Sequence, residues 1–203
     1  MSKIEKELWK EYEYIVGCDE VGRGCFAGPL VAACVMLPKG YLNHEINDSK
    51  KVKVDLRIVL DKIIREKAIE YQIVTLDAYE PDFNPKTASK KAMEMAINNF
   101  KHKIDLIITD YENIETNKEQ INLIKGDNLS FNVASASIIA KVFRDNLMAT
   151  FDDVYPGYDF KSHKGYGTKY HKEAIEKLGI SPIHRIAYRP IKALLKKMNS
   201  EEK

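Results

Sequence analysis

The sequence predicts an α/β protein in which helices flank a mixed β-sheet. Its 203 residues are 44% hydrophobic and 31% charged, a composition typical of one globular domain. Two apolar runs come first with a glycine-rich turn between them, and later apolar runs alternate with segments of helical periodicity. Strands joined by a turn pair antiparallel and strands joined through a helix pair parallel, so this order predicts a sheet of mixed direction.

Short apolar runs mark the expected strands. Residues 14–18 and 30–37 flank the glycine-rich turn and are expected to pair, and the second run ends at Pro38. The remaining expected strands are residues 69–76, 104–109 and 121–124.

Helical spacing and capping residues mark the expected helices. Apolar side chains recur at helical spacing from Leu56 to Ile64, and Asp48 or Ser49 could cap this helix. The Gly- and Tyr-rich residues 155–170 are expected to be irregular. The later expected helices are residues 85–101, 133–151, about 168–178 with Thr168 as the N-cap, and 190–198.

Composition excludes several classes of protein. No segment reaches the roughly 18 uninterrupted apolar residues of a membrane helix, and the N-terminus is too charged for a signal peptide, so a cytoplasmic protein is expected. Cys18, Cys25 and Cys34 fit neither a CxxC metal pair nor a disulfide framework and are expected to be buried free thiols. The histidines lack zinc-ligand spacing, so any metal should have oxygen ligands.

Charge is unevenly distributed along the chain. Residues 161–203 contain 11 Lys or Arg and 4 Asp or Glu, although the whole chain has a net charge of only +2. This basic end is either a solvated helical face or a phosphate-binding surface.

A glycine-rich segment offers one alternative function. Residues 22–27 match the GxGxxA form of the dinucleotide-binding fingerprint, which would indicate an oxidoreductase. In that fold the glycines open a helix, whereas here Pro29 and a β-branched run predict another strand. Asp19 and Glu20 would also repel a pyrophosphate, so this alternative is disfavoured.

Acidic residues follow two of the expected strands. Asp19 and Glu20 come after the first and should point to opposite faces unless the glycine turn twists the second one back. Asp110 ends another strand, and Asp127 lies 17 residues further on. Four carboxylates gathered in an apolar fold would raise one another's pKa values unless a cation joined them. Mg²⁺ or Mn²⁺ prefers such oxygen ligands, so the sequence permits metal-assisted phosphodiester hydrolysis.

These segments resemble a known family. Residues 18–24 (CDEVGRG) and 27–29 (AGP) resemble the signature of type 2 ribonucleases H, bacterial ribonuclease HII in particular. The resemblance spans about residues 14–192. Further matches follow in order at residues 47–51 (NDSKK), Asp110, 125–127 (KGD), 136–142 (ASIIAKV), 144–145 (RD), 163–168 (HKGYGT) and 182–185 (PIHR).

The resemblance implies a fold and a set of site residues. The fold is a ribonuclease H-like mixed five-stranded sheet flanked by helices, forming a single catalytic domain over residues 1–203 with a basic, helical substrate-binding portion from about 155. Tyr166 corresponds to a tyrosine that stacks beside the ribonucleotide and helps select an RNA–DNA junction. The implied metal ligands are Asp19, Glu20, Asp110 and Asp127, and the implied substrate contacts are Gly22, Arg23, Gly24, Ser130, His163, Lys164 and Tyr166. Lys192 is a further candidate phosphate contact, and charge alone adds Lys196 and Lys197.

Some positions depart from the family pattern. Cys25-Phe26 stands where Pro-Leu is common, Tyr111 where glycine is usual, and Leu129 where lysine is frequent. All four acids are retained, so metal binding is still expected, and the departures are expected to affect substrate affinity and the shape of the pocket beside Asp110.

The expected activity is therefore that of an endoribonuclease with two divalent ions, Mn²⁺ or Mg²⁺. It should cut the RNA strand of RNA/DNA hybrids and the 5′ side of single ribonucleotides in duplex DNA, leaving 3′-OH and 5′-phosphate ends, during DNA replication and repair. A monomer acting on nucleic acid is expected, with no membrane association. The alternatives are a ribonuclease HIII type, disfavoured because only about 13 residues precede the first strand, and a non-catalytic hybrid-binding protein.

Overall fold

The computed structural model describes residues 4–47, 49, 51–77 and 83–201. The chain divides into two compact units. The sheet unit comprises Met1–Val21, Val31–Thr75 and Ser89–Val142, and the C-terminal unit comprises Gly22–Leu30, Leu76–Ala88 and Phe143–Lys203. The expectation of a single domain stays a prediction.

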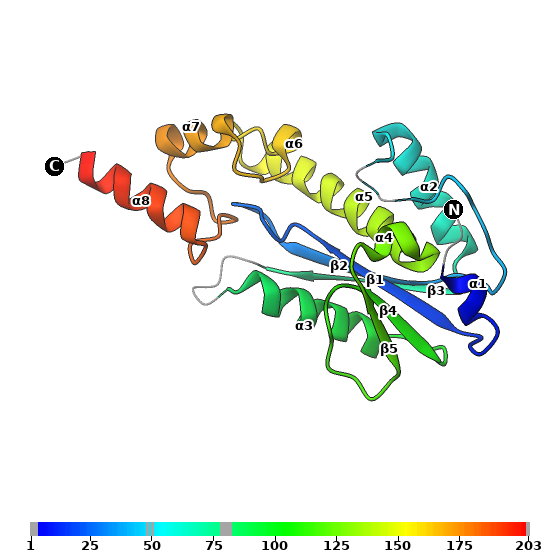
Figure 1. Ribbon diagram of the computed structural model, residues 1–203. Helices are drawn as coiled ribbons and strands as arrows, with labels where there is room; N and C mark the ends of the chain where they lie inside the picture. The colour runs from blue at the N-terminus through cyan, green and yellow to red at the C-terminus, as the bar shows by residue number, and fades with distance from the viewer. Residues whose placement is uncertain (1–3, 48, 50, 78–82, 202–203) are drawn as a thin grey trace. The chain divides into compact units, whose positions relative to one another are not determined.

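The sheet has five strands in the order β3-β2-β1-β4-β5 (Figure 1). β1 pairs antiparallel with β2 and parallel with β4, and β4 pairs parallel with β5, so the predicted mixed sheet is confirmed. The strands are β1 (Ile15–Val21), β2 (Leu30–Met36), β3 (Glu70–Leu76), β4 (Leu106–Asp110) and β5 (Gln120–Leu123).

Helices cover both faces of this sheet. α3 lies on one face and the first part of α5 on the other (Figure 1). Every residue of β2 is buried, which explains its continuous apolar run, since a strand covered on both faces needs no polar alternation. The helices that contribute to this unit are α1 (Glu5–Leu8), α2 (Val54–Lys67), α3 (Pro85–Asn98), α4 (Gly126–Leu129) and α5 (Phe131–Val154).

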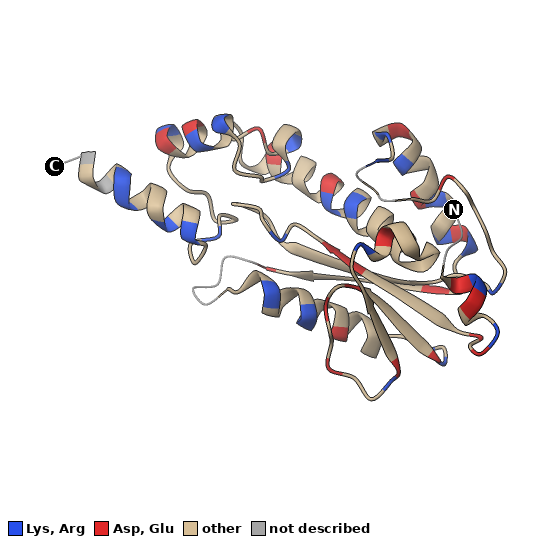
Figure 2. Ribbon diagram, viewed as in Figure 1, with Lys and Arg blue, Asp and Glu red and all other residues tan. Residues whose placement is uncertain are grey.

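The C-terminal unit is helical and has its own aromatic core. The end of α5 contributes Met148 to a cluster that includes Phe26, Tyr158 and Phe160. As predicted, Thr168 caps α7 by accepting a hydrogen bond from the His171 backbone N–H at 3.2 Å. The other helices of this unit are α6 (Phe160–His163), α7 (Lys169–Leu178) and α8 (Arg189–Glu201). Basic positions recur along α8 (Figure 2).

Several local predictions need correction. β1 continues to Val21, so its ladder includes both acids that were expected to follow it. α2 begins at Val54 after Lys53, without a side-chain cap. Ser49 is instead buried and hydrogen-bonded to Ser137, and Asp48 lies outside the described residues. The short helices α1, α4 and α6 had no periodicity to predict them, because four residues make only one turn.

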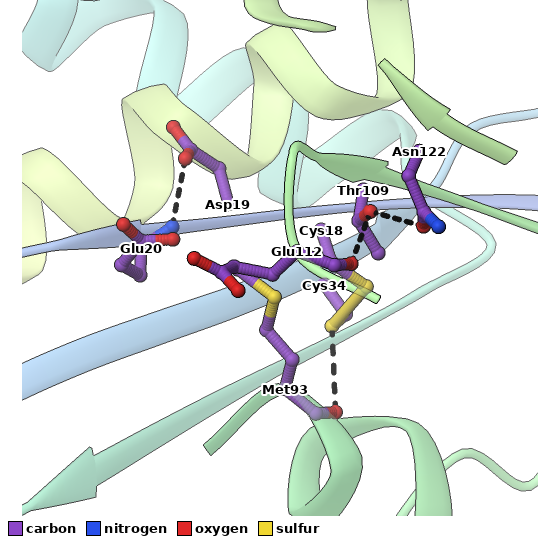
Figure 3. Close-up of a disulfide and its surroundings, with 8 residues drawn as sticks. All are labelled: Cys18, Asp19, Glu20, Cys34, Met93, Thr109, Glu112 and Asn122. Carbon is purple, nitrogen blue, oxygen red and sulfur yellow. Dashed lines mark hydrogen bonds between the residues drawn. A yellow bond between two sulfur atoms is a disulfide. The ribbon is translucent and has the colours of Figure 1, made fainter. Parts of the chain in front are cut away.

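The cysteine prediction was wrong for two of the three residues. Cys18 and Cys34 form a disulfide between β1 and β2, on the side of the sheet that faces α3 (Figure 3). They are register partners in the antiparallel ladder, with Cα atoms 4.2 Å apart, so sheet pairing brings together residues 16 apart in sequence. Cys25 is a buried free thiol, as expected.

Candidate active site

Strand register places two of the predicted acids next to each other. Cys18 of β1 pairs with Thr109 of β4, so the next residues along these parallel strands are Asp19 and Asp110. Residues opposite each other in neighbouring strands project to the same face. Asp19 points to the side of the sheet covered by α5 (Figure 3). The two carboxylates therefore share that face.

Asp19 is a buried carboxylate held in place by hydrogen bonds. It is 7% exposed, and its Oδ1 accepts a hydrogen bond from the Glu20 backbone N–H at 2.8 Å. The Ser137 side chain also hydrogen-bonds to it, and the Ser137 Oγ lies 2.9 Å from the Ser49 Oγ. This chain of hydroxyl groups fixes the Asp19 side chain from the α5 side.

The electrostatics of the site disfavour a charged Asp19. Burial, followed by the negative charges of Glu20 and then Asp110, raises the pKa of Asp19 well above its usual value, against the smaller opposite effect of its hydrogen bonds. Three of the predicted acids thus interact, and the site has an excess of negative charge that a cation would relieve.

The fourth acid is linked to the third through backbone. Asp110 Oδ1 accepts a hydrogen bond from the Gly126 N–H at 2.8 Å, and Gly126 begins α4, whose first turn contains Asp127. Asp127 is buried, and its Oδ1 accepts a hydrogen bond from Asn128 Nδ2 at 2.8 Å. Asp110 therefore ties the end of β4 to the turn that holds Asp127.

The backbone conformation at Tyr111 explains why glycine is usual at this position in the family. Its φ of 68° lies in the left-handed region, where glycine is favoured because it has no Cβ. Its side chain is 60% exposed. The family's glycine fits this conformation, and Tyr111 adopts it with its ring directed to solvent next to Asp110.

The carboxylate oxygens of the site suit a hard divalent cation, although the described side chains do not all converge on one point. Within the described residues, no three or more His, Cys, Asp or Glu side chains form a ready-made metal cluster. The available donors are carboxylate oxygens. Burial, and then repulsion from Glu20 and Asp110, raises the pKa of Asp19, and a bound Mg²⁺ or Mn²⁺ would stabilise its charged form. The residues thus fit such an ion, and the assignment of Asp19, Glu20, Asp110 and Asp127 as its ligands stays a prediction.

Two buried arginines build the glycine-rich loop of the C-terminal unit. Arg144 donates hydrogen bonds to the carbonyl oxygens of Pro29 and Ala27, and Arg185 donates to those of Gly28 and Arg23. Both guanidinium side chains are fully buried. The loop joins β1 to β2 and leads into no helix, which excludes the dinucleotide-binding geometry.

Arg144 also explains why position 22 of this loop is a glycine. Gly22 has a φ of 94°, and a Cβ added there would lie 2.4 Å from the Arg144 Nε. Gly24 is different, because an added Cβ would meet no atom within 4 Å. Ser137, Arg144 and Arg185 lie within the family motifs, but the sequence alone indicated no role for them. The available signal was a polar or charged residue within a largely apolar segment.

The remaining predicted contacts differ in accessibility. Ser130 is fully buried in the sheet unit, where its hydroxyl donates to Glu5 Oε1 at 2.5 Å and accepts from the Val133 N–H at 3.1 Å. Tyr166, in the C-terminal unit, is 41% exposed. Partial burial, followed by the neighbouring Cys25, raises the pKa of Tyr166 to about 12, so its hydroxyl stays protonated.

Two further predicted contacts adjoin Tyr166. His163 is buried, and both of its ring nitrogens are hydrogen-bonded within the unit. The Lys164 Nζ donates to the Asp145 carbonyl oxygen at 3.3 Å, and the Lys164 carbonyl accepts from Arg144. His163 is thus positioned to shape the loop, and Tyr166 presents the exposed side chain.

Comparison with known proteins decides the family. The ribonuclease HII family model matches residues 16–190. The chain belongs to the ribonuclease HII family. The ribonuclease HII of Mycoplasma mycoides subsp. mycoides SC is 48% identical over 186 residues, which cover 90% of each protein. The chain is accordingly a ribonuclease H enzyme, and the resemblance inferred from the motifs is confirmed.

Solved structures confirm the fold of this ribonuclease HII family member. The ribonuclease H2 of Pyrococcus horikoshii OT3 is similar with a TM-score of 0.79 and 20% identity, over 92% of this chain and 99% of that one. The structure of Bst-RNase HIII in complex with Mn²⁺ is similar with a TM-score of 0.68 and 17% identity, over 93% and 71% of the two chains. No helix among the described residues is long and apolar enough to span a membrane.

Proposed function

We propose that this member of the ribonuclease HII family cuts on the 5′ side of single ribonucleotides embedded in duplex DNA, as well as within the RNA strand of RNA/DNA hybrids. The observation that carries the proposal is the placement of Asp19 beside Asp110 in neighbouring strands, with the charge of Glu20 acting on the same carboxylate. Neighbouring carboxylates of this kind suit hydrolysis of a phosphodiester with the help of two divalent cations, giving 3′-OH and 5′-phosphate ends. The similarity to a ribonuclease HIII solved with Mn²⁺ supports Mn²⁺ or Mg²⁺ as the ion.

The carboxylates supply a fixed negative framework for this reaction. Divalent cations bound there would neutralise charge on the scissile phosphate and lower the pKa of an adjoining water. Hydrogen bonds from Ser137 and the Glu20 N–H hold Asp19, and one from the Gly126 N–H holds Asp110. Because these side chains are already held, little conformational entropy is lost when they bind a ligand.

The loops of the C-terminal unit would recognise the ribonucleotide. Backbone groups of Gly22, Arg23 and Gly24 are proposed to contact the 2′-OH, the group that distinguishes RNA from DNA. The open space above Gly24 lets a sugar approach that backbone closely. The exposed ring of Tyr166 is proposed to stack on the adjacent deoxyribose. Lys192, Lys196 and Lys197 on α8 would contact phosphates.

A protein with this function acts on nucleic acid. We propose that it does so as a cytoplasmic monomer, removing ribonucleotides during DNA replication and repair.

A cleavage assay tests the proposal. End-labelled duplex DNA with one ribonucleotide is incubated beside a uniform RNA/DNA hybrid and an all-DNA duplex, each with Mg²⁺, Mn²⁺ or chelator. Cleavage 5′ to the lone ribonucleotide, abolished by chelator and by Asp110→Asn, is expected. Cleavage of the hybrid alone would contradict junction recognition by Tyr166, and near-wild-type turnover of Asp110→Asn would contradict the ligand assignment.

A further inference from the structure

Three buried histidines lie together beneath the Tyr166 loop of the C-terminal unit. The rings of His163 and His171 are stacked, with centroids 4.2 Å apart and an interplanar angle of 14°. The Nε2 atoms of His171 and His184 lie 3.1 Å apart. His171 is 0% exposed and His184 is 1% exposed. The acidic residues of the candidate active site leave these three histidines without an assigned role in the reaction.

The hydrogen bonds of this cluster determine which ring nitrogen carries each proton. The Ser181 backbone N–H, which can only donate, and the Ser181 hydroxyl both lie 2.8 Å from His184 Nδ1. The Ser181 carbonyl oxygen is farther away, at 3.3 Å, so Nδ1 accepts. A neutral His184 therefore carries its proton on Nε2 and donates it to His171 Nε2. The remaining proton of His171 is then on Nδ1, which donates to the Tyr166 carbonyl oxygen at 2.9 Å.

His163 fixes the residue before Tyr166 in the same way. The Gly165 N–H donates to His163 Nδ1 at 3.1 Å, so the proton of His163 lies on Nε2 and is donated to the Tyr158 carbonyl oxygen at 2.7 Å. All six ring nitrogens of the cluster are thus engaged inside the unit. None of them has a lone pair left for a metal ion. The cluster instead forms hydrogen bonds with backbone groups of the surrounding loops.

Burial keeps His171 and His184 neutral at physiological pH. It lowers the pKa of His171 to about 3 and that of His184 to about 4, with smaller contributions from neighbouring histidines. A proton added to His171 Nε2 would face the N–H of His184, donor against donor. The chain of hydrogen bonds therefore persists in one direction, from Ser181 through both rings to Tyr166.

We propose that His171 and His184 are positioning residues for junction recognition, because their fixed tautomers hold the Tyr166 backbone so that its exposed ring meets the deoxyribose beside a ribonucleotide. The inference rests on the proposed function of Tyr166. It predicts that selectivity for embedded ribonucleotides depends on a proton at His171 Nδ1, whereas cleavage of a uniform hybrid depends on it much less.

A matched pair of variants separates this role from packing. In His171→Asn the amide nitrogen can take the position of Nδ1 and still donate to the Tyr166 carbonyl oxygen. In His171→Gln the amide lies near the position of Nε2, so the bond to Tyr166 is lost while the bond to His184 can remain. Both variants lose the ring and its stacking on His163, so a role in packing alone would affect them alike.

The readout is the ratio of kcat/KM for a single embedded ribonucleotide to kcat/KM for a uniform hybrid. His171→Gln should lower this ratio by about 5- to 10-fold, the effect of one lost hydrogen bond, and His171→Asn should stay within about 2-fold of wild type. Equal ratios in both variants would overturn the inference. A wild-type enzyme that does not cut the embedded ribonucleotide would overturn the proposed function itself.

A second measurement needs no variant to fold. Two-bond ¹H–¹⁵N correlation spectra of the wild-type protein near pH 7 report which ring nitrogen is protonated. His171 should show the Nδ1–H tautomer, while His163 and His184 should show Nε2–H. An Nε2–H tautomer at His171 would overturn the inference whatever the cleavage assay gives.

Discussion

Gly17 offers a direct test of how β1 and α5 together support the candidate site. It lies in β1, two residues before Asp19, and faces the first turn of α5. A Cβ added at Gly17 would lie 2.2 Å from the Asn132 carbonyl carbon and 2.2 Å from the Val133 nitrogen. These are backbone atoms, so no side-chain rotation can relieve the contact.

The substitution Gly17→Ala must therefore move the helix relative to the strand. Ordinary contacts of a Cβ begin at 3.4 Å, so the required shift is about 1 Å. Overpacking of a core costs about 1–3 kcal/mol, and a clash with backbone belongs at the upper end, about 3 kcal/mol. In a chain of this size that corresponds to a fall in Tm of about 6–12 °C.

Thermal unfolding followed by circular dichroism measures this change. Gly24→Ala is the matched control for stability, because an added Cβ there meets no atom within 4 Å and should change stability by less than about 0.5 kcal/mol. The shift of α5 also moves Ser137 away from Asp19, so Gly17→Ala should lower activity as well. If Gly17→Ala melted within about 2 °C of wild type, the close approach of β1 and α5 would be refuted.

Three further predictions concern charged and buried groups. Asp19→Asn should raise the Tm of the metal-free protein, because it removes a buried carboxylate repelled by its neighbours, while lowering cleavage by more than about 100-fold; a lower Tm would contradict the raised pKa of Asp19. Burial lowers the pKa of His171 to about 3 and that of His184 to about 4, so below about pH 6.5 these histidines bind protons in the unfolded chain before they do so in the folded protein. The free energy of unfolding should therefore decrease by about 3 kcal/mol between pH 6.5 and 5. Denaturant unfolding at the two pH values measures this decrease, and an unchanged free energy of unfolding would contradict it. Arg185→Lys cannot reproduce the pair of hydrogen bonds from Nε and Nη2 to the Gly28 carbonyl oxygen and should destabilise the protein by about 2–4 kcal/mol, measured as a lower denaturation midpoint at unchanged m-value; wild-type stability would show that this bidentate contact is dispensable.

Local patterns in the sequence were sufficient for most elements of the fold. Helical spacing, good helix formers and terminal residues together predicted α2, α3, α5, α7 and α8 close to their observed bounds, and the apolar runs located all five strands. The cap at Thr168 was also predictable, because an N-cap depends on residues only three positions apart. Such signals depend on neighbouring residues, so they can be recognised without knowledge of the tertiary structure.

Sequence motifs proposed the members of the candidate site, but they contained no information on its geometry. The motif identified Asp19, Glu20, Asp110 and Asp127 as candidate ligands. Strand order and register then decided that Asp19 lies beside Asp110, 91 positions further along the chain, and that Ser137 holds it from a helix. No periodicity contains that information, because pairing between distant segments depends on how the whole sheet assembles.

By itself, the sequence determined the family, the mixed sheet and the acidic and glycine-rich motifs of this protein. Tertiary structure alone decided the disulfide between Cys18 and Cys34, which sheet pairing sets opposite each other. It also decided the tautomers of His171 and His184. A buried ring takes its proton position from the partners that surround it, and those partners come from segments that meet only when the chain folds.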